Sequence, residues 1–355
     1  MLRFSNFLFP EARDPADDAR IIAESIEEAK LCDALGVEVL WLAEHHFDGN
    51  CAYVDPVTFA ASVLTATKRI KVGFAVAQVS LHHPMRLAEQ MSLLDNIGKG
   101  RVIVGLGRGT AYNVYEYQGY GIPAEEALAR YEEAEAIMLK AWTSEEGFSH
   151  EGQFWSVKVP LLRPRPFTKP HPYVIRAASS EDGALHLARR GLPFLMNVQS
   201  LEITQRRLAI YRATMEDHGF DAAHVARCMD QSWVWRNIVV ADTDAEARRI
   251  GIPAFEAMQE HRAKMRLRIQ REQGVIMKAD TSVPARVQAE HALIAGSPAT
   301  VAARMAELDA TGVGGVICSF RLGPMEAAFA RNSIGLFMTE VAPRFAMGKV
   351  PVGAQ

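Results

Sequence analysis

The chain has 355 residues, of which 49% are hydrophobic and 23% are charged, so it carries enough apolar material for a large folded core. Its formal net charge of −3 offers no basic field for nucleic acid or an anionic membrane, and no apolar run approaches the roughly 18 residues of a membrane-spanning helix. The four cysteines include no Cys-x-x-Cys pair, which disfavours a zinc or redox motif and favours reduced thiols in the cytoplasm.

Short β-rich runs alternate with longer runs of helical period along the chain. The predicted strands are 2–9, 37–44, 70–79, 101–106, 173–178, 193–198, 233–240 and 315–320. The predicted helices are 17–35, one from 56, 84–97, 124–142, 181–190, 201–218, 244–261, one from 298, and 326–344. Alternation of this kind implies a parallel sheet. Eight strands without a domain-like linker favour one (β/α)8 TIM barrel over residues 1–355 rather than a doubly wound sheet.

Two insertions interrupt this pattern. Residues 143–172 are polar and aromatic, with a hairpin predicted at 149–158. Residues 262–294 contain many Lys, Arg and Gln and show no clear repeat. A stretch of that length is interpreted either as a lid over the site or as a solvated insertion. Because barrel enzymes carry their chemistry at the carboxyl ends of the strands, the candidate residues are sought there.

The second strand ends in the segment 44–47, Glu-His-His-Phe. Adjacent strand residues point to opposite sides, so one histidine can face the barrel mouth while the other packs. This arrangement disfavours a shared metal ion, which would need help from His82 and His83. We interpret His45 as an acid or base near neutral pH, with its tautomer fixed by Glu44. A purely structural histidine is the alternative.

The fourth strand ends in the segment 105–110, Gly-Leu-Gly-Arg-Gly-Thr. It is not a full dinucleotide fingerprint, because Thr110 stands where a glycine is required and four tyrosines follow at 112–120 in a predicted loop. Glycines such as Gly107 let a flat ring approach the backbone, and Arg108 can grip a phosphate with its planar fork. The alternative is a tight turn with an arginine salt bridge.

The fifth strand leads through Ser179 and Ser180 into a predicted helix. Either hydroxyl can cap that helix, and the same N-terminus offers free N–H groups to an anion. The motif by itself is compatible with an ordinary cap and with a phosphate site.

Together these motifs resemble the bacterial luciferase-like flavin monooxygenases over most of the chain. The resemblance rests on the order and spacing of many short pieces rather than on any one of them. The pieces are Asn6-Phe7, 41–47 (Trp-Leu-Ala-Glu-His-His-Phe), 70–73 (Ile-Lys-Val-Gly), His83-Pro84, 87–90 (Leu-Ala-Glu-Gln), Leu94-Asp95, Gly100-Arg101, 105–109, 191–193 (Gly-Leu-Pro), 296–298 (Gly-Ser-Pro) and 341–345 (Val-Ala-Pro-Arg-Phe).

The resemblance implies that reduced FMN binds at the carboxyl end of the barrel and reacts with O2 at its C4a position, giving a peroxide that oxidises a small organic substrate. Tyr112, Tyr115, Phe194 and Met196 suggest that this substrate is apolar. No second nucleotide-binding fold is visible, so a separate NAD(P)H-dependent flavin reductase is expected to supply the reduced flavin.

The resemblance also assigns residues. His45 matches the catalytic histidine of the family. Arg108 matches the arginine on the FMN phosphate, and Ser180, with Ser179 before it, matches the serine beside that phosphate.

Further positions follow from the same resemblance. A non-proline cis peptide under the flavin ring is expected between Ala75 and Val76. Light-emitting members commonly have cysteine where this chain has Gly107, and luciferases carry an acidic residue where it has Ser179. A non-luminous member is therefore expected.

Several alternatives remain at this point. One is an oxidoreductase of the same superfamily that uses the deazaflavin F420. Another is a non-catalytic partner subunit like the supporting chain of luciferase, and a third is a metal-dependent hydrolase.

Family members usually dimerise through helices early in the barrel, so residues 56–67 and 84–97 could form the face of a homodimer or of a heterodimer with a related chain. These helices could equally pack only on their own barrel.

Overall fold

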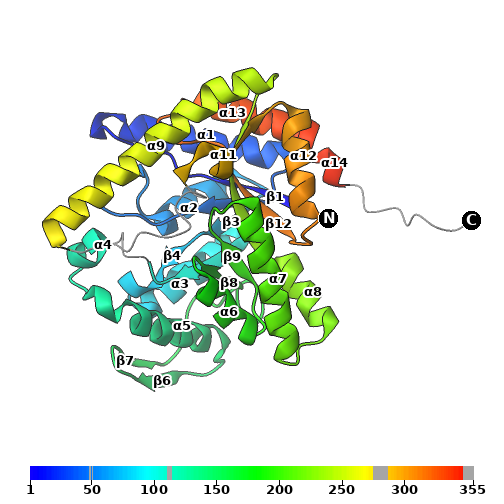
Figure 1. Cartoon of the computed structure of the whole chain (residues 1–355). Coiled ribbons are helices and arrows are strands. Elements are labelled where there is room, and N and C mark those ends of the chain that lie inside the picture. Colours follow the sequence, from blue (N-terminus) through cyan, green and yellow to red (C-terminus); the bar gives the residue numbers. More distant parts are fainter. Residues whose placement is uncertain (48, 50, 110–113, 275–286, 347–355) are drawn as a thin grey trace, which may run out of the picture.

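The fold is a closed barrel of parallel strands surrounded by helices (Figure 1). The computed structural model describes residues 1–47, 49, 51–109, 114–274 and 287–346. The barrel strands are β1 (Arg3–Phe7), β2 (Val39–Leu42), β3 (Lys71–Phe74) continued by β4 (Ala77–Gln78), β5 (Val102–Gly107), β8 (Tyr173–Ala178), β9 (Phe194–Met196), β10 (Trp233–Val240) and β12 (Gly315–Ser319). They pair in this order, and the β12–β1 pairing closes the ring. All eight predicted strands and the (β/α)8 class are confirmed.

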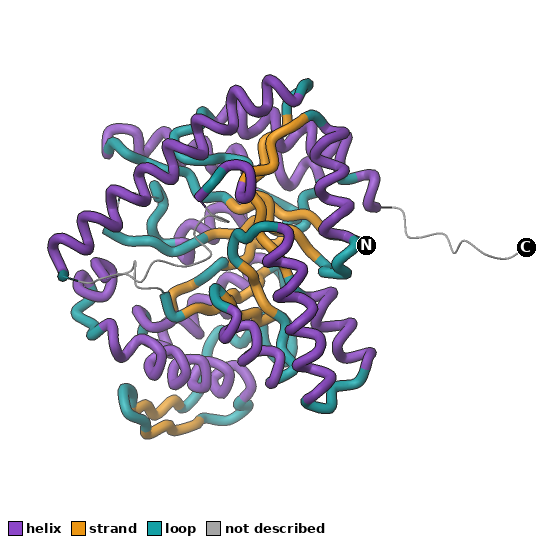
Figure 2. Tube along the Cα trace, viewed as in Figure 1, coloured by secondary structure: helices purple, strands orange, loops and turns teal. Residues whose placement is uncertain are grey.

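Helices cover the outside of the barrel, and Figure 2 shows them as an outer layer around the strands. The long helices are α1 (Asp18–Leu35), α2 (Pro56–Ala66), α3 (Pro84–Gly98), α5 (Ala127–Thr143), α6 (Glu181–Arg189), α7 (Leu201–Asp217), α8 (Ala222–Gln231), α9 (Asp244–Gln273), α12 (Pro298–Asp309) and α13 (Ala327–Leu336). The short helical elements are η1 (Pro15–Asp17), η2 (Val79–Leu81), α4 (Val114–Gly119), η4 (Ala124–Glu126), α11 (Ala289–Ala292), the π-helix η5 (Phe337–Val341) and α14 (Pro343–Ala346). No described helix is long and apolar enough to cross a membrane.

Local sequence explains where these helices begin and end. Asp55 and Ser297 cap α2 and α12 by accepting hydrogen bonds from first-turn N–H groups, and proline follows each cap at the first helical position. Gly36 ends α1 with a left-handed φ of 80°. The hairpin predicted at 149–158 is confirmed as β6 (Phe148–Glu151) and β7 (Ser156–Val159).

The barrel interior is filled by alternate strand residues, with Trp41 and Trp233 at its centre in an edge-on contact of 5.6 Å. A Cβ on Gly73 would lie 2.5 Å from the Trp41 ring, and one on Gly315 would lie 2.2 Å from the Trp233 ring. Two large indoles therefore fit inside the barrel because the neighbouring strand carries glycine at the position paired with each tryptophan.

Residues 262–294, in which no clear repeat is predicted, contain more regular structure than that pattern indicates. The helix predicted to end near residue 261 continues as α9 to Gln273, and β11 (Leu293–Gly296) adds to β10 outside the ring. Ion pairs one turn apart, such as Lys264–Glu260 at 2.7 Å, stabilise this polar helical extension. Residues 275–286 lie outside the described part of the chain, so the lid interpretation is untested there.

The loop predicted to carry the tyrosines at 112–120 is also partly wrong. Tyr115 and Tyr117 belong to the short helix α4, whereas Tyr112 lies outside the described residues. The far end of α9 reaches α4 (Figure 1), and the Tyr115 hydroxyl donates to Glu272 Oε2 at 2.5 Å. Contacts between residues more than 150 positions apart in the sequence thus help to stabilise α4, a helix that the local sequence pattern does not predict.

Candidate functional site

The candidate residues lie at the carboxyl ends of adjacent barrel strands. His45 follows β2, the segment 75–76 joins β3 to β4, Arg108 follows β5 and Ser180 follows β8. Since β2, β3, β5 and β8 are neighbours in the sheet, the fold brings all four positions to one arc of the same end. This is the end at which barrel enzymes carry their active sites.

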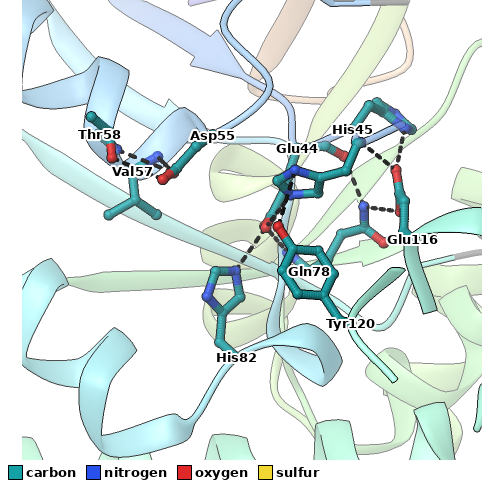
Figure 3. Close-up of polar contacts among 10 residues, drawn as sticks. Glu44, His45, Asp55, Val57, Thr58, Gln78, His82, Glu116 and Tyr120 are labelled. Carbon is teal, nitrogen blue, oxygen red and sulfur yellow. Dashed lines mark hydrogen bonds and ion pairs between the residues drawn. The ribbon is translucent and has the colours of Figure 1, made fainter. Parts of the chain in front are cut away.

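His45 faces the barrel end and is partly accessible, with 35% of its side chain exposed. Its ring lies edge-on to Phe9 at 5.3 Å, and its Nδ1 is 3.3 Å from Glu116 Oε1 (Figure 3). His46 is instead buried, with 8% of its side chain exposed. The predicted divergence of the two histidines is confirmed.

Glu44 does not orient His45, and the prediction that it fixes the His45 tautomer is wrong. Its Oε1 accepts from His46 Nε2 at 3.0 Å and pairs with His82 Nε2 at 2.7 Å (Figure 3). Its Oε2 accepts from the backbone N–H of Gln78 at 2.6 Å. The reason is strand alternation: residues 44 and 46 share one face, and His45 lies on the other.

The Glu44 cluster is charged and buried. Burial alone would raise the pKa of Glu44, but hydrogen bonds from His46 and His82 outweigh it and lower that pKa to about 2. Burial lowers the pKa of His82, but its hydrogen bond and charge interaction with Glu44 outweigh burial and raise that pKa overall. The pair therefore favours a carboxylate facing an imidazolium in the weakly acidic range.

Glu116, which the sequence did not single out, is the carboxylate beside His45. It is 2% exposed, its Oε1 accepts from the His46 backbone N–H at 2.9 Å, and its Oε2 accepts from Gln78 Nε2 at 2.5 Å. Gln78 also donates through the same nitrogen to the Glu44 carbonyl at 2.8 Å, so one amide joins the two acidic residues. No strand-end motif could indicate Glu116, because it comes from α4.

The glycines of β5 allow that strand to approach the segment after β3. A Cβ on Gly105 would lie 1.6 Å from the Phe74 carbonyl oxygen, and one on Gly107 would lie 2.4 Å from Val76 Cγ2. The space beside Gly107 is thus filled by the chain itself, not left open for a flat ring. The cis peptide expected between Ala75 and Val76 is present at this contact.

Arg108 has an exposed side chain and a fixed backbone. Its carbonyl oxygen accepts from the Ser80 hydroxyl at 3.2 Å and also from the Tyr117 hydroxyl. Among the described residues, no group pairs with its guanidinium, so the alternative of a turn closed by an arginine salt bridge finds no support in that part of the chain.

Ser180 is the N-cap of α6, where its Oγ accepts from the Gly183 N–H at 3.1 Å. Ser179 is exposed beside it, and its carbonyl accepts from Asn197 Nδ2 at 3.1 Å. The capping interpretation of Ser180 is therefore confirmed, and the first turn of α6 opens at the same barrel end as Arg108.

Two residues expected near an apolar substrate lie elsewhere. Phe194 and Met196 are fully buried between the barrel and its helices, with Phe194 packed against Tyr211 of α7 at 4.7 Å. Their suggested role is wrong, because odd and even residues of β9 face opposite sides and these two face outward. No group of three His, Cys, Asp or Glu in the described ranges is arranged to hold a metal ion.

Comparison with known proteins places this geometry in a family. Residues 2–315 match the model of luciferase-like monooxygenases. The chain belongs to this family. It is 27% identical over 231 residues to the alkanal monooxygenase alpha chain of a Kryptophanaron alfredi symbiont, covering 64% of this chain and 63% of that protein. It is 28% identical over 178 residues to the oxygenase component of the flavin-dependent trigonelline monooxygenase of Acinetobacter baylyi, covering 50% and 49%. The matched regions thus span about half to two thirds of these relatives.

Solved structures of similar fold cover nearly the whole of this family member. The monooxygenase RslO1 of Streptomyces bottropensis superposes with a TM-score of 0.80 at 25% identity, covering 97% of this chain and 100% of that one. An F420-dependent secondary alcohol dehydrogenase superposes with a TM-score of 0.71, covering 96% and 98%. At 14% identity, that second likeness shows the fold alone.

Proposed function

We propose that this luciferase-like protein is a monooxygenase that uses reduced FMN and O2 to oxidise a small, apolar organic substrate. The observation that carries the proposal is the arc of residues at the carboxyl end of the barrel. On it, Arg108 follows β5, the first turn of α6 follows the neighbouring strand β8, and His45 with Glu116 lies two strands away from β5.

The residues at β5 and β8 suit the phosphate of FMN. Arg108 presents an exposed planar cation without a partner among the described residues, and the Ser180-capped N-terminus of α6 opens on the adjacent strand. A guanidinium fork and a helix N-terminus are both favourable partners for a phosphate. Two acidic residues, Glu181 and Asp182, lie in that first turn, and Arg206 offsets part of their charge by pairing with Glu181 at 2.6 Å.

Apolar residues at the same end suit a flat ring. Phe9, Ala75, Val76 and Trp235 are partly buried and pack on top of the barrel-interior cluster. The Trp235 Nε1–H is buried without an acceptor in the described part of the chain. A ring with polar edge atoms could accept this hydrogen bond, which fits FMN better than a wholly apolar ligand.

When bound, reduced flavin supplies the activation of O2, and the protein supplies position, exclusion of water and proton control. We propose that His45 holds or transfers a proton at the reacting centre, because it is a partly exposed titratable group on this arc. Glu116 would stabilise its charged form and fix its orientation through the contact with Nδ1.

The relatives support a two-component system. One is named as an oxygenase component, and another as the alpha chain of an alkanal monooxygenase. We therefore propose that a separate NAD(P)H-dependent reductase delivers reduced FMN to this chain. The alpha-chain relative equally supports assembly as a homodimer or with a related chain.

An F420-dependent oxidoreductase is the second candidate, because a dehydrogenase with that cofactor shares the fold. The two candidates differ in the cofactor bound and in the need for O2. Anaerobic titration with reduced FMN and with reduced F420 separates them, and tighter binding of F420 would overturn the FMN assignment.

The phosphate assignment is tested by the same titration on two variants. We expect Arg108→Ala to weaken reduced-FMN binding by roughly tenfold to a hundredfold, as loss of a charge-assisted pair predicts. Arg227→Ala is the matched control. Arg227 is an exposed arginine near the end of α8, and α8 leads into the first residue of β10, so Arg227 lies toward the opposite end of the barrel from Arg108. Unchanged affinity in Arg108→Ala would show that the phosphate binds elsewhere.

A further inference from the structure

A cavity lies outside the barrel, away from the strand ends that carry His45 and Arg108. It has a volume of about 950 Å³ and lies among the start of α7, α9, β11 and α12. This volume is within the range of small-molecule sites in proteins. Neither the family assignment nor the proposed flavin chemistry uses it.

The cavity arises where β10 changes its neighbour. Val234 still pairs with Met196 of β9, but from Asn237 onward β10 pairs with Leu293 of β11. Between these pairings Trp235 packs on the barrel-interior cluster, and the next residue, Arg236, points to the other side and lines the cavity.

Arg236 is a buried cation at the floor of this cavity, with 3% exposure. Its Nη1 donates to the Trp235 carbonyl at 2.7 Å and its Nη2 donates to Thr204 Oγ1 at 2.7 Å. Both acceptors are neutral, and no carboxylate of the described residues pairs with it. Burial lowers the pKa of Arg236 to about 10, which still leaves it charged at neutral pH.

A buried charge without a counter-ion is unfavourable unless something else compensates it. A guanidinium has five N–H donors, and only two of those of Arg236 have acceptors in the described structure. The floor of the cavity is therefore set up to receive an anion from outside the chain.

The rest of the lining limits the charge of that anion. Arg248 and Arg304 line the cavity, but so do three carboxylates, and Arg304 pairs with one of them at 3.0 Å. The carboxylates are Glu202, Glu290 and Glu307. Without Arg236, the two arginines and three carboxylates of the rim leave a net charge of about −1 when His291 is counted as neutral. A single negative charge is favoured over a polyphosphate, which would meet repulsion there.

The walls determine the body of the ligand. Leu201 and Ile203 of α7, Ile252 of α9 and Ile294 of β11 supply apolar surface around the arginine. These side chains match a hydrocarbon or aromatic group rather than a sugar.

We propose that this cavity is a second ligand site, which binds a monocarboxylate with an apolar body. The carboxylate pairs with Arg236, and the body lies between Ile203 and Ile294. Because Arg236 and Trp235 are adjacent on β10, the strand that holds this ligand also holds a residue of the barrel end.

Calorimetric titration of the full-length, flavin-free protein with octanoate tests the proposal. We expect one octanoate per chain, with octanol and inorganic phosphate each binding at least about tenfold more weakly, since each lacks one half of the ligand. Arg236→Met should weaken octanoate by about tenfold or more, whereas Arg304→Met, which removes a rim charge already paired with Glu307, should change it by less than about twofold.

A second variant keeps the test valid if Arg236→Met does not fold. Ile203→Glu adds a negative charge to the wall at the first turn of α7, where an acidic residue suits the helix. It should abolish octanoate binding and leave the unfolding temperature nearly unchanged. Absence of octanoate binding to the wild-type chain, equal binding of octanol, or undiminished binding by folded Arg236→Met or Ile203→Glu would overturn the proposal.

Discussion

At the residue scale, the site depends on which carboxylate faces which histidine. Glu116 faces His45, whereas Glu44 holds His46 and His82 on the opposite side of the strand end. The pairing gives each carboxylate a separate effect: Glu116 bears on the reaction at His45, and Glu44 bears on the stability of the barrel end.

Glu116→Gln tests the first effect. Loss of the carboxylate removes the stabilisation of a charged His45, so we expect the reaction of bound reduced FMN with O2 to slow by about tenfold or more. The pH profile of that rate, measured by stopped flow, should also move toward lower pH. Glu125→Gln is the control, because Glu125 is an exposed residue of η4, the short helix that follows α4. An unshifted pH profile would mean that Glu116 only maintains structure.

His82→Gln tests the second effect through its dependence on pH. The depressed pKa of Glu44 gives stability that is present above the ordinary glutamate pKa of 4.5 and is lost as the pH falls toward 2. The raised pKa of His82 gives stability that is complete below the ordinary histidine pKa of 6.5 and is lost as the pH rises through the raised value.

The pair is therefore most stabilising between pH 4.5 and 6.5. We expect His82→Gln to lower the free energy of unfolding by about 2 kcal/mol near pH 6, and by clearly less near pH 9. Urea denaturation at both pH values measures this, with the exposed His83→Gln as the control. An equal loss at both pH values would argue against a charged His82.

At the scale of elements, β5 lies in close contact with the segment after β3. Gly107→Ala would place a Cβ 2.4 Å from Val76 Cγ2, and the branched valine has little freedom to move away. We expect the change to cost roughly 1–3 kcal/mol of unfolding free energy, as overpacking does.

The double variant with Val76→Ala should recover much of that loss, because it removes the clashing methyl groups. Gly335→Ala, which has open space around its Cβ in α13, should be neutral or stabilising. Thermal denaturation of the wild type and these three variants measures the differences. No loss in Gly107→Ala, or no recovery in the double variant, would contradict this account of the contact.

The sequence predicts those elements that local pattern controls. Each barrel strand was found because it is a short buried run between turn residues, and helices were bounded by caps such as Ser180 and stops such as Gly36. The helical continuation of α9 past residue 261 was missed because it is polar on most faces and owes its stability partly to ion pairs such as Arg268–Glu272.

The same distinction holds for the site. Positions 45, 108 and 180 could be placed from strand ends alone, since a barrel brings those ends together. Glu116 could not, because α4 lies at the site through long-range contacts such as that between Gln118 and Gln273 at 2.7 Å. The pairing of Glu44 with His46 instead of His45 follows from alternation, which places residues 44 and 45 on opposite faces.

At the scale of the whole molecule, the outer face of α3 exposes two large apolar residues. Leu93 and Ile97 lie one turn apart, with 51% and 38% of their surfaces exposed. We propose that this face forms a subunit contact, as the early helices of the barrel were expected to do. Exposed leucine and isoleucine at this spacing are suited to helix packing between two copies.

Light scattering tests this subunit contact. The wild-type chain should have twice its monomer mass of 39.2 kDa. Leu93→Glu should shift it toward the monomer, whereas Phe329→Glu, at an exposed apolar residue of α13, should not. A monomeric wild type would contradict the proposal for a homodimer, and a dimer undisturbed by Leu93→Glu would place the contact on another face.

The central claim is that this barrel binds reduced FMN and directs its reaction with O2 through His45. The most direct measurement is stopped-flow absorbance after anaerobic loading with reduced FMN and mixing with O2. We predict a transient absorbing species distinct from reduced and oxidised FMN, with altered formation or decay in His45→Ala. Direct conversion to oxidised FMN at the rate of free flavin, identical in the wild type and His45→Ala, would contradict the account.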